Sequence, residues 1–459
     1  MDWIPTLADR KGPVYLQIVE ALAADLESGL LSRGQRLPTH RALAGALGID
    51  LTTVTRAYAE ARGRGLTEAR VGQGTFVAES LSRPRRAAAE PWPDVDLSMN
   101  LPPQPLEADL EGRLTRGIAA IRRETGFSAL LSYRDAGGSR AERDLAAAWL
   151  RPRIPAARGE RLVICPGTQN ALFNLLAALT SPGEIILTEA FTYPGIKAAA
   201  AYAGVRLAGV PMDRHGILPD ALDDACRRHA PKAVYLMPTI HNPTAATMPP
   251  ARRREVAGIL RRNDVLLIED DAYGALEPDA APLASLIPER TYHAASLSKC
   301  IAPGLRLSFV LAPDVPSAGL VTAALRASAQ MPAPLMVALA ARWLKDGSAD
   351  AIVAAIRTEA AARQKLAAGL LARHAFQAHP HGHHIWIPLP HAWTGAEFAA
   401  HLRRRGLAIV TAEAFSVEAP AMHAVRVSLG AAGSRSELVG ALDIVVAALR
   451  APAARTSVV

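Results

Sequence analysis

The 459-residue sequence is poor in cysteine and lacks long apolar runs, and each shortage excludes a class of protein. Three scattered cysteines, Cys165, Cys226 and Cys300, are too few for a fold held together by disulfides. The first residues, MDWIPTLADRKG, lack the apolar stretch of a secretory signal. The most apolar late segment, 320–344, contains two arginines and two prolines, which rules out a span of ~20 apolar residues. We therefore expect a cytoplasmic protein without membrane segments.

Lysine is also scarce, supplying six of the 51 basic residues. Codon composition accounts for such an excess of arginine beside abundant alanine. The net charge of +8 and the pI near 9.7 are therefore weak evidence for nucleic-acid binding. Half of the residues are hydrophobic and the mean hydropathy is +0.11, which is enough to build several buried cores. This composition excludes disorder of the whole chain.

One segment divides the sequence. Residues 79–95 carry three prolines, an arginine cluster and no helical or strand periodicity, so we expect a linker there. Before it the pattern predicts a small domain of short helices over 1–78. After it we expect a large domain over 96–335 and a smaller α+β domain over 336–459.

Short apolar runs alternate with helical segments in the large domain. Continuous apolar character suits strands that are covered on both faces. Such alternation predicts an α/β fold with a seven-stranded, mainly parallel sheet, and ligands at the loops beyond the carboxyl ends of the strands. The expected strands are 162–165, 184–188, 205–210, 233–237, 265–269, 292–296 and 306–312.

The N-terminal region predicts three helices. A first amphipathic helix spans 13–30, a second runs from Thr39 as N-cap to Gly48, and a third over 52–62 follows a three-residue turn. Two short helices joined by such a turn are a helix-turn-helix. The run LTEARVGQGTFV then has two β-prone stretches around 72–74, which predicts a hairpin, or wing.

The ordered series over 13–77 resembles the GntR-type winged helix, which implies binding to double-stranded operator DNA. Between Arg33 and Arg70 the charge is +4, from seven arginines and three acidic residues. An ordinary solvated face would explain this charge, but the winged-helix pattern favours phosphate contacts. The family usually opens its third helix with Ser-Arg or Thr-Arg, whereas Asp50 and Leu51 stand here, so we expect a different operator. The DNA-contacting positions carried over are Arg41, Thr52, Thr53, Arg56, Gly72, Gln73, Gly74 and Thr75.

The sharpest chemical signal is SLSKCIAPGLRLS at 296–308. A lysine after a strand, preceded by hydroxyls and followed by an arginine, suits a carbonyl cofactor that bears a phosphate. PGTQNAL at 166–172 opens a helix whose N–H groups can bind an anion. FTYPG, HNPT and EDDAYG add an aromatic ring, an amide, and a carboxylate with a phenol. Each fragment alone reads as a turn, a cap or core, but together they indicate one ligand.

Residues 96–450 resemble the fold-type I aminotransferases, and residues 1–450 resemble the MocR branch of GntR regulators, which implies pyridoxal 5′-phosphate. By this resemblance Lys299, Asp270 and Tyr273 are catalytic, and Arg426 binds a substrate carboxylate. Asn100, where a glycine is common, lies near the substrate. The cofactor contacts implied are Lys299 on the aldehyde, Asp270 on the ring nitrogen, Asn242 and Tyr273 on the 3′ oxygen, Tyr193 on the ring face, Thr168, Gln169, Ser296, Ser298 and Arg306 on the phosphate, and Tyr133 on a neighbouring subunit's phosphate.

Three functions fit these motifs: a ligand-responsive regulator, an aminotransferase with a residual DNA module, or both. The intact winged helix favours a homodimeric transcriptional regulator that senses an amino compound or pyridoxal phosphate. The aminotransferase stays as the alternative because Lys299, Asp270 and Arg426 are present. The histidines of HPHGHHIW read as a turn entering a strand rather than a metal site, because alternation would place His383 and His384 on opposite faces.

Overall fold

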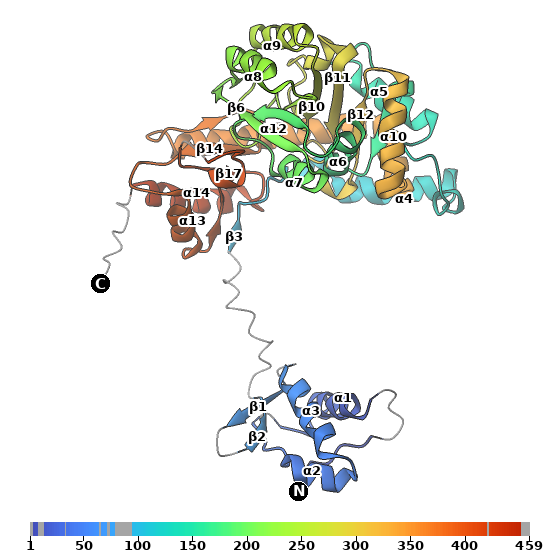
Figure 1. The fold of residues 1–459 in the computed structure, drawn as a ribbon, viewed down its shortest axis with the longest axis vertical. Helices are drawn as coiled ribbons and strands as arrows, with labels where there is room; N and C mark the ends of the chain where they lie inside the picture. The colour runs from blue at the N-terminus through green and yellow to red at the C-terminus, as the bar shows by residue number, and fades with distance from the viewer. Residues whose placement is uncertain are drawn as a thin grey trace. The chain divides into compact units, whose positions relative to one another are not determined.

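The chain forms two compact units, Met1–Trp92 and Pro93–Val459 (Figure 1). The computed structural model describes residues 3–7, 13–32, 34–63, 66–70, 74–78, 94–419 and 422–450. In this part of the chain no helix is long and apolar enough to cross a membrane. Val95, which the predicted linker includes, lies in strand β3 (Val95–Asp96).

The smaller unit is the expected winged helix-turn-helix. Thr39 caps the second helix through a hydrogen bond from the Ala42 N–H to its hydroxyl at 3.2 Å, and Gly48 ends that helix with φ of 66°. The two strands pair antiparallel, and Leu43, Val54 and Tyr58 are buried in the core between helices. Its elements are α1 (Val14–Glu27), α2 (His40–Leu47), α3 (Leu51–Gly63), β1 (Thr67–Arg70) and β2 (Gly74–Val77).

The larger unit contains the predicted seven-stranded sheet, in the order β4-β12-β11-β10-β9-β5-β6. Neighbouring strands are parallel except at β12, which runs antiparallel to both β11 and β4. The predicted α/β class and its mainly parallel sheet are therefore confirmed. The strands are β4 (Leu162–Cys165), β5 (Ile185–Glu189), β6 (Arg206–Val210), β9 (Ala233–Leu236), β10 (Leu266–Asp271), β11 (Thr291–Ser296) and β12 (Ser308–Leu311).

Helices surround this sheet. Helix α6 packs against α7 and α10, α5 packs against α11, and α8 packs against α9. A two-stranded ribbon of β7 (Met212–Asp213) and β8 (Gly216–Ile217) precedes α8. The helices are α4 (Leu110–Glu124), α5 (Arg140–Leu150), α6 (Thr168–Leu179), α7 (Pro194–Ala203), α8 (Pro219–His229), α9 (Pro250–Arg262), α10 (Val315–Ala329) and α11 (Pro334–Lys345).

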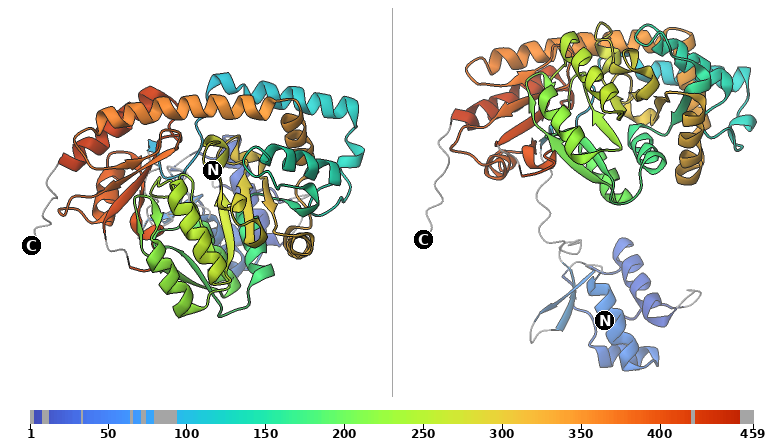
Figure 2. Two further views of the ribbon diagram at one scale, coloured as in Figure 1. Left: turned by 90° about the horizontal axis from the view of Figure 1, so that it is seen from above. Right: turned by 45° about the horizontal axis from the view of Figure 1, so that its top comes forward.

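A smaller α+β lobe follows. Its long helix α12 contacts both α11 of the large lobe and α14 of the small lobe (Figure 2). Strand β3, which directly follows the linker region, pairs in parallel with β15 of this lobe. The lobe comprises α12 (Ser348–Leu370), β13 (Gln377–Ala378), β14 (His384–Pro388), α13 (Gly395–Arg403), β15 (Leu407–Ala408), β16 (Val410–Thr411), β17 (Ala424–Ser428) and α14 (Arg435–Arg450).

All three cysteines are buried in the larger unit. Cys165 is the last residue of β4, Cys226 lies in α8, and Cys300 directly follows Lys299. Burial raises the pKa of both the Cys165 and the Cys300 thiols to about 12. These side chains therefore act as small apolar core residues.

Candidate functional site

The candidate site lies where the parallel strands end. Asp270 is the second-last residue of β10, Lys299 follows β11, and Tyr193 follows β5 as the N-cap of α7. Parallel strands present their carboxyl ends at one edge of the sheet, so these residues converge although they are far apart in sequence. Thr168 opens α6 directly after β4 and joins the same group of loops.

Asp270 is a buried carboxylate with one free oxygen. Its Oδ2 accepts a hydrogen bond from the Tyr235 hydroxyl at 2.8 Å, while its Oδ1 has no partner among the described residues. Burial raises the pKa of Asp270 to about 6, and the hydrogen bond from Tyr235 opposes that rise. The free oxygen is available to a ligand that donates a hydrogen bond.

Lys299 is half-buried, and its amine reaches a backbone carbonyl. Its Nζ donates a hydrogen bond to the backbone oxygen of Asn100, and the backbone oxygen of Lys299 lies 2.7 Å from His383 Nε2. Burial first, and then the positive charge of Arg426, lower the pKa of Lys299 to about 8. A sizeable fraction of the amine is thus unprotonated and nucleophilic at neutral pH.

Asn100 connects Tyr273 to a histidine of the small lobe. Its Nδ2 donates to the Tyr273 hydroxyl at 2.6 Å and lies 3.1 Å from Nδ1 of His384. Burial raises the pKa of Tyr273, so its phenol stays protonated. The side chain at position 100, where a glycine is common, therefore fixes the phenol rather than leaving space beside it.

Arg426 lies buried on β17, facing the large lobe. Its Nη1 donates to Asn242 Oδ1 at 2.9 Å, and its Nη2 donates to the backbone oxygen of Ser98. The guanidinium carbon also lies 4.9 Å from the centre of the Phe415 ring. Burial lowers the pKa of Arg426 to about 10, so the group remains a cation at neutral pH. Two of its donors are held by neutral acceptors that an anionic ligand can replace.

An anion cradle lies at the N-terminus of α6. Gly167, with φ of 83°, leaves room for Arg306: a Cβ atom there would stand 2.7 Å from Nη2 of that arginine. Thr168 Oγ1 is buried and has no partner among the residues described. Helix N–H groups, this hydroxyl and the guanidinium together suit a phosphate.

The remaining predicted cofactor residues divide into two groups. The Tyr193 ring and Gln169 close over Gly195, where an added Cβ would collide with both, and Gln169 Nε2 donates to the Gly195 oxygen at 2.9 Å. Ser296 Oγ accepts from the backbone N–H of Ser298 at 3.1 Å. Tyr133, in contrast, is 84% exposed and takes no part in the site of its own chain.

Several residues of the site were not singled out from the sequence. Tyr235 holds Asp270 from the middle of β9, and Glu189, at the end of β5, is fully buried with a pKa raised to about 8 by that burial. His383 and His384 both flank the Tyr273 ring, at centroid distances of 5.6 and 5.9 Å. Glu189 could have been found from the sequence, because it is a polar residue directly after a predicted apolar strand. Nothing in the sequence around Tyr235 marks it as a residue of the site.

The two other histidines of that run meet an acid. His381 Nδ1 lies 2.8 Å and His379 Nε2 lies 3.6 Å from Oε2 of Glu277. The backbone N–H of His381 points at Nδ1 of His379, so the proton of the neutral His379 ring resides on Nε2. Glu277 is thus hydrogen-bonded to His381 and lies at ion-pair distance from His379.

The DNA-contacting candidates lie on exposed parts of the smaller unit. Arg41 and Thr52 are exposed near the starts of α2 and α3, Thr53 is half-buried, and the Arg56 guanidinium stacks 4.1 Å from the Tyr15 ring. Asp50 Oδ1 accepts hydrogen bonds from the N–H of Thr52, at 2.7 Å, and from its hydroxyl. Gly74 and Thr75 lie in β2, whereas Gly72 and Gln73 fall outside the described residues.

The donor set fits pyridoxal phosphate. Oδ1 of Asp270 is a buried, unpartnered acceptor for a ring nitrogen, and the cradle at Gly167 and Arg306 suits the phosphate. Lys299 follows β11, which lies in the sheet between β10, with Asp270, and β4, which precedes the cradle. Its amine suits the aldehyde. The residues present therefore match the cofactor on all three of its functional groups.

Fold and site define a pyridoxal phosphate domain of fold type I, joined to a winged helix. Residues 94–445 match the family of aminotransferases of class I and II, and residues 14–77 match the bacterial regulatory proteins of the gntR family. The chain therefore belongs to the class I and II aminotransferase family and, with its GntR domain, to the MocR-type transcriptional regulators. Its cofactor is pyridoxal phosphate.

Similar proteins agree with this assignment. The chain is 30% identical to the HTH-type transcriptional regulator YdeF of Bacillus subtilis over 95% of each chain. It is also 30% identical to the vitamin B6 salvage pathway transcriptional repressor PtsJ of Salmonella typhimurium, over 91% of this chain and 94% of that protein. LysN, an α-aminoadipate aminotransferase from Thermus thermophilus, shares the fold, with a TM-score of 0.71 at 23% identity over 77% of this chain and 92% of LysN.

Proposed function

We propose that this cytoplasmic regulator binds operator DNA through residues 1–78 and changes its DNA affinity when an amino compound enters the pyridoxal phosphate site. Two hydrogen bonds accepted by the segment just after the linker support this proposal. The backbone oxygen of Ser98 holds Arg426, and that of Asn100 holds Lys299. The two groups that would receive an amino acid are therefore both engaged by residues at the root of the linker.

This arrangement gives a route from ligand to linker. A ligand carboxylate on Arg426 displaces the Ser98 oxygen because a bidentate ion pair is stronger than a bond to a neutral carbonyl. The same segment is tied to the small lobe: the N–H of Val95 donates to the Gly406 oxygen at 3.0 Å, and that of Leu97 to the Ala408 oxygen at 2.9 Å. Ligand binding thus shifts the C-terminal end of the linker together with the small lobe.

The side chains of the site have separate roles in this proposal. When bound, pyridoxal phosphate supplies an aldehyde that captures amines and a ring that withdraws electrons. Asp270 Oδ1 accepts a hydrogen bond from the ring N–H and keeps the proton there. Lys299 supplies the amine that holds the aldehyde, and Tyr273 and Asn242 bind the 3′ oxygen. Tyr193 covers the ring, and Thr168, Gln169, Ser296, Ser298 and Arg306 bind the phosphate.

DNA binding rests on the exposed face of the winged helix. Arg41 near the start of α2, and Thr53 and Arg56 in the first two turns of α3, offer donors, and Thr75 follows the wing tip. The Thr52 hydroxyl is engaged by Asp50, which leaves its methyl group for the DNA. We infer that this departure from Ser-Arg or Thr-Arg shifts the preferred operator rather than removing binding.

A homodimer completes the proposal. Tyr133 and Leu131 are 84% and 85% exposed, although the large domain buries most of its other apolar side chains. Large aromatic and aliphatic side chains that are exposed close together are typical of a subunit interface. We assign Tyr133 to the phosphate of the partner's cofactor.

Operator binding tests the function directly. The probe is duplex DNA from upstream of the protein's own gene, measured by fluorescence anisotropy with and without pyridoxal phosphate and a panel of amino acids. We expect affinity to change with one of these ligands, and Lys299→Ala to abolish the change while retaining DNA binding. Lys345→Ala, an exposed lysine at the end of α11, is the matched control. Identical operator binding by Lys299→Ala and the native chain under all conditions would refute the coupling.

A working aminotransferase is the second candidate, favoured by the complete set of Lys299, Asp270 and Arg426 in one buried site. The lowered pKa of Lys299 suits a general base as well as an anchor for the cofactor. A half-reaction assay with single amino donors separates the candidates. Multiple turnover with an oxo-acid acceptor, without any ligand effect on DNA binding, would favour the enzyme.

A further inference from the structure

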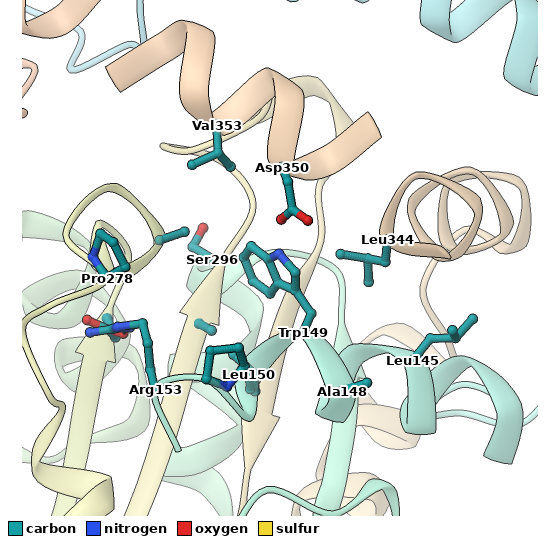
Figure 3. Close-up of a pocket in the computed structure, with 14 residues that line it drawn as sticks. Leu145, Ala148, Trp149, Leu150, Arg153, Pro278, Ser296, Leu344, Asp350 and Val353 are labelled. Atoms are coloured by element: carbon teal, nitrogen blue, oxygen red, sulfur yellow. The ribbon is translucent and has the colours of Figure 1, made fainter. Parts of the chain in front are cut away.

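A cavity of the larger unit is lined by residues of β10, β11, α5, α11 and α12 (Figure 3). Asp270 and Asp271 are neighbours at the end of β10, and successive residues of a strand face opposite sides. Asp270 faces the cofactor side, and Asp271 lines the cavity. The cavity has a volume of about 370 Å³, within the ~300–1,000 Å³ of small-molecule sites.

Helices and strands form its walls. Leu145 and Trp149 come from α5, Leu344 from α11 and Val353 from α12, and Pro278 closes one side (Figure 3). These side chains are apolar, and the Trp149 indole presents a flat surface. Rigid elements rather than loops thus shape most of a chamber suited to a flat, apolar molecule.

The charges that line the cavity are unequal. Arg153 and Asp271 pair with each other at its floor, and Arg153 Nη2 also donates to the Ala280 oxygen at 2.8 Å, so this pair is self-neutralising. Asp350, in the first turn of α12, is exposed and has no hydrogen bond or ion pair with the residues that the structure describes. Figure 3 shows its carboxylate directed toward Trp149. One negative charge therefore remains unmatched at the rim.

We propose that this cavity is a second ligand site, for a small, flat, largely apolar amine that carries one positive charge. The apolar body lies against Trp149, and the ammonium group pairs with Asp350 beside the indole face. Arg153 and Asp271 form the polar floor. Because Arg153 is already paired with Asp271, it does not offer a free positive charge to a ligand carboxylate. Asp271 faces the opposite side of β10 from Asp270, whereas Ser296, at the end of β11, both lines this cavity and belongs to the predicted phosphate group, so the two sites adjoin at this serine.

The test uses N,N-dimethyl-2-phenylethylamine, a tertiary amine that cannot condense with the cofactor's aldehyde. Isothermal calorimetry on the full-length, cofactor-loaded protein should show one site per chain with a Kd in the millimolar range. Asp350→Asn should weaken binding about fivefold, the effect of a partly exposed ion pair. Asp443→Asn, at an exposed aspartate of α14, is the matched control and should bind as the native chain does.

Two further measurements fix the location and the charge preference. Ala148→Phe adds bulk from α5 at an exposed position of the cavity wall and should abolish binding without disturbing the core. The smaller, uncharged 2-phenylethanol should bind more weakly than the amine, and 3-phenylpropanoate more weakly still. The proposal is overturned if the amine does not bind, if it binds Asp350→Asn or Ala148→Phe unchanged, or if either analogue binds as well as the amine.

Discussion

We expect Lys299 to set the pH at which the protein takes up its cofactor. Because the pKa of its amine is lowered to about 8, the nucleophilic form becomes dominant above pH 8 instead of near pH ~10.4. Stopped-flow absorbance of cofactor-free protein should therefore show covalent uptake of pyridoxal phosphate that rises with pH around a midpoint near 8. Arg426→Gln removes a charge that lowers this pKa, so its midpoint should move upward. A midpoint above 10 in the native chain would contradict the burial of this amine.

Tyr235 is expected to tune Asp270. The Tyr235→Phe variant removes the hydrogen bond that lowers the pKa of Asp270, so that pKa rises above about 6 and more of the carboxyl is protonated at pH 7. We expect cofactor affinity at pH 7 to fall about tenfold and to recover as the pH is raised. Equilibrium titrations at several pH values measure this. Tyr292→Phe, a buried tyrosine on β11, is the control, and equal losses in both variants would exclude a specific role for Tyr235.

At the scale of elements, the start of α6 is the most sensitive place for the cofactor. Gly167 and Gly183 both have positive φ, of 83° and 89°, but only at Gly167 would a Cβ meet Arg306; at Gly183 it would meet nothing within 4 Å. Alanine at either position should cost ~1–3 kcal/mol of unfolding free energy, measured in urea. Only Gly167→Ala should also weaken pyridoxal phosphate binding. An equal affinity in both variants would argue against an anion cradle there.

The recognition helix offers a gain-of-function prediction. Leu51 is the first residue of α3 and is 41% exposed. Leu51→Arg restores a cation where the family usually has one, so duplex affinity should rise and log K should fall more steeply with log salt, by about 0.9. Leu320→Arg, on α10 and 54% exposed, adds the same charge outside the winged helix. If both variants gained affinity equally, the effect would be one of net charge alone.

The sequence predicted the elements well because their signals are local. All seven runs of the large sheet and the three helices of the winged helix have the periodicity or the caps that mark them, as Thr39 and Gly48 do for α2. Lys299 and Asp270 stood out because polar residues directly after apolar strands are unusual.

Contacts that depend on pairing between distant segments were not predictable. Tyr235 reads as a core residue in AVYL, and its hold on Asp270 follows only from the parallel pairing of β9 with β10. Strand alternation was expected to separate His383 from His384, but β14 begins at His384, so His383 precedes the strand and both rings reach Tyr273. Cavities formed by several helices leave no local pattern at all.

For the whole molecule, we expect a dimer in which each chain completes the other's site. Tyr133→Phe should weaken cofactor binding, and Lys299→Ala should remove covalent capture. Co-expression of these two variants should restore one complete site per mixed dimer, because the Lys299→Ala chain supplies Tyr133 to its partner. Sedimentation at several concentrations gives the assembly state. A monomer at every concentration that still retains cofactor would contradict this organisation.

The burial of every thiol has a practical consequence. A thiol with a pKa near 12 is almost entirely protonated at neutral pH, so peroxide and alkylating reagents react with it slowly while the fold is intact. The protein should therefore keep its response under oxidative stress. The rate of thiol alkylation therefore measures how often the larger unit opens, because residues 1–78 contain no cysteine that would contribute to the signal. Alkylation of Cys300, next to Lys299, reports exposure of the cofactor-binding loop, and alkylation of Cys165 reports exposure of the central sheet.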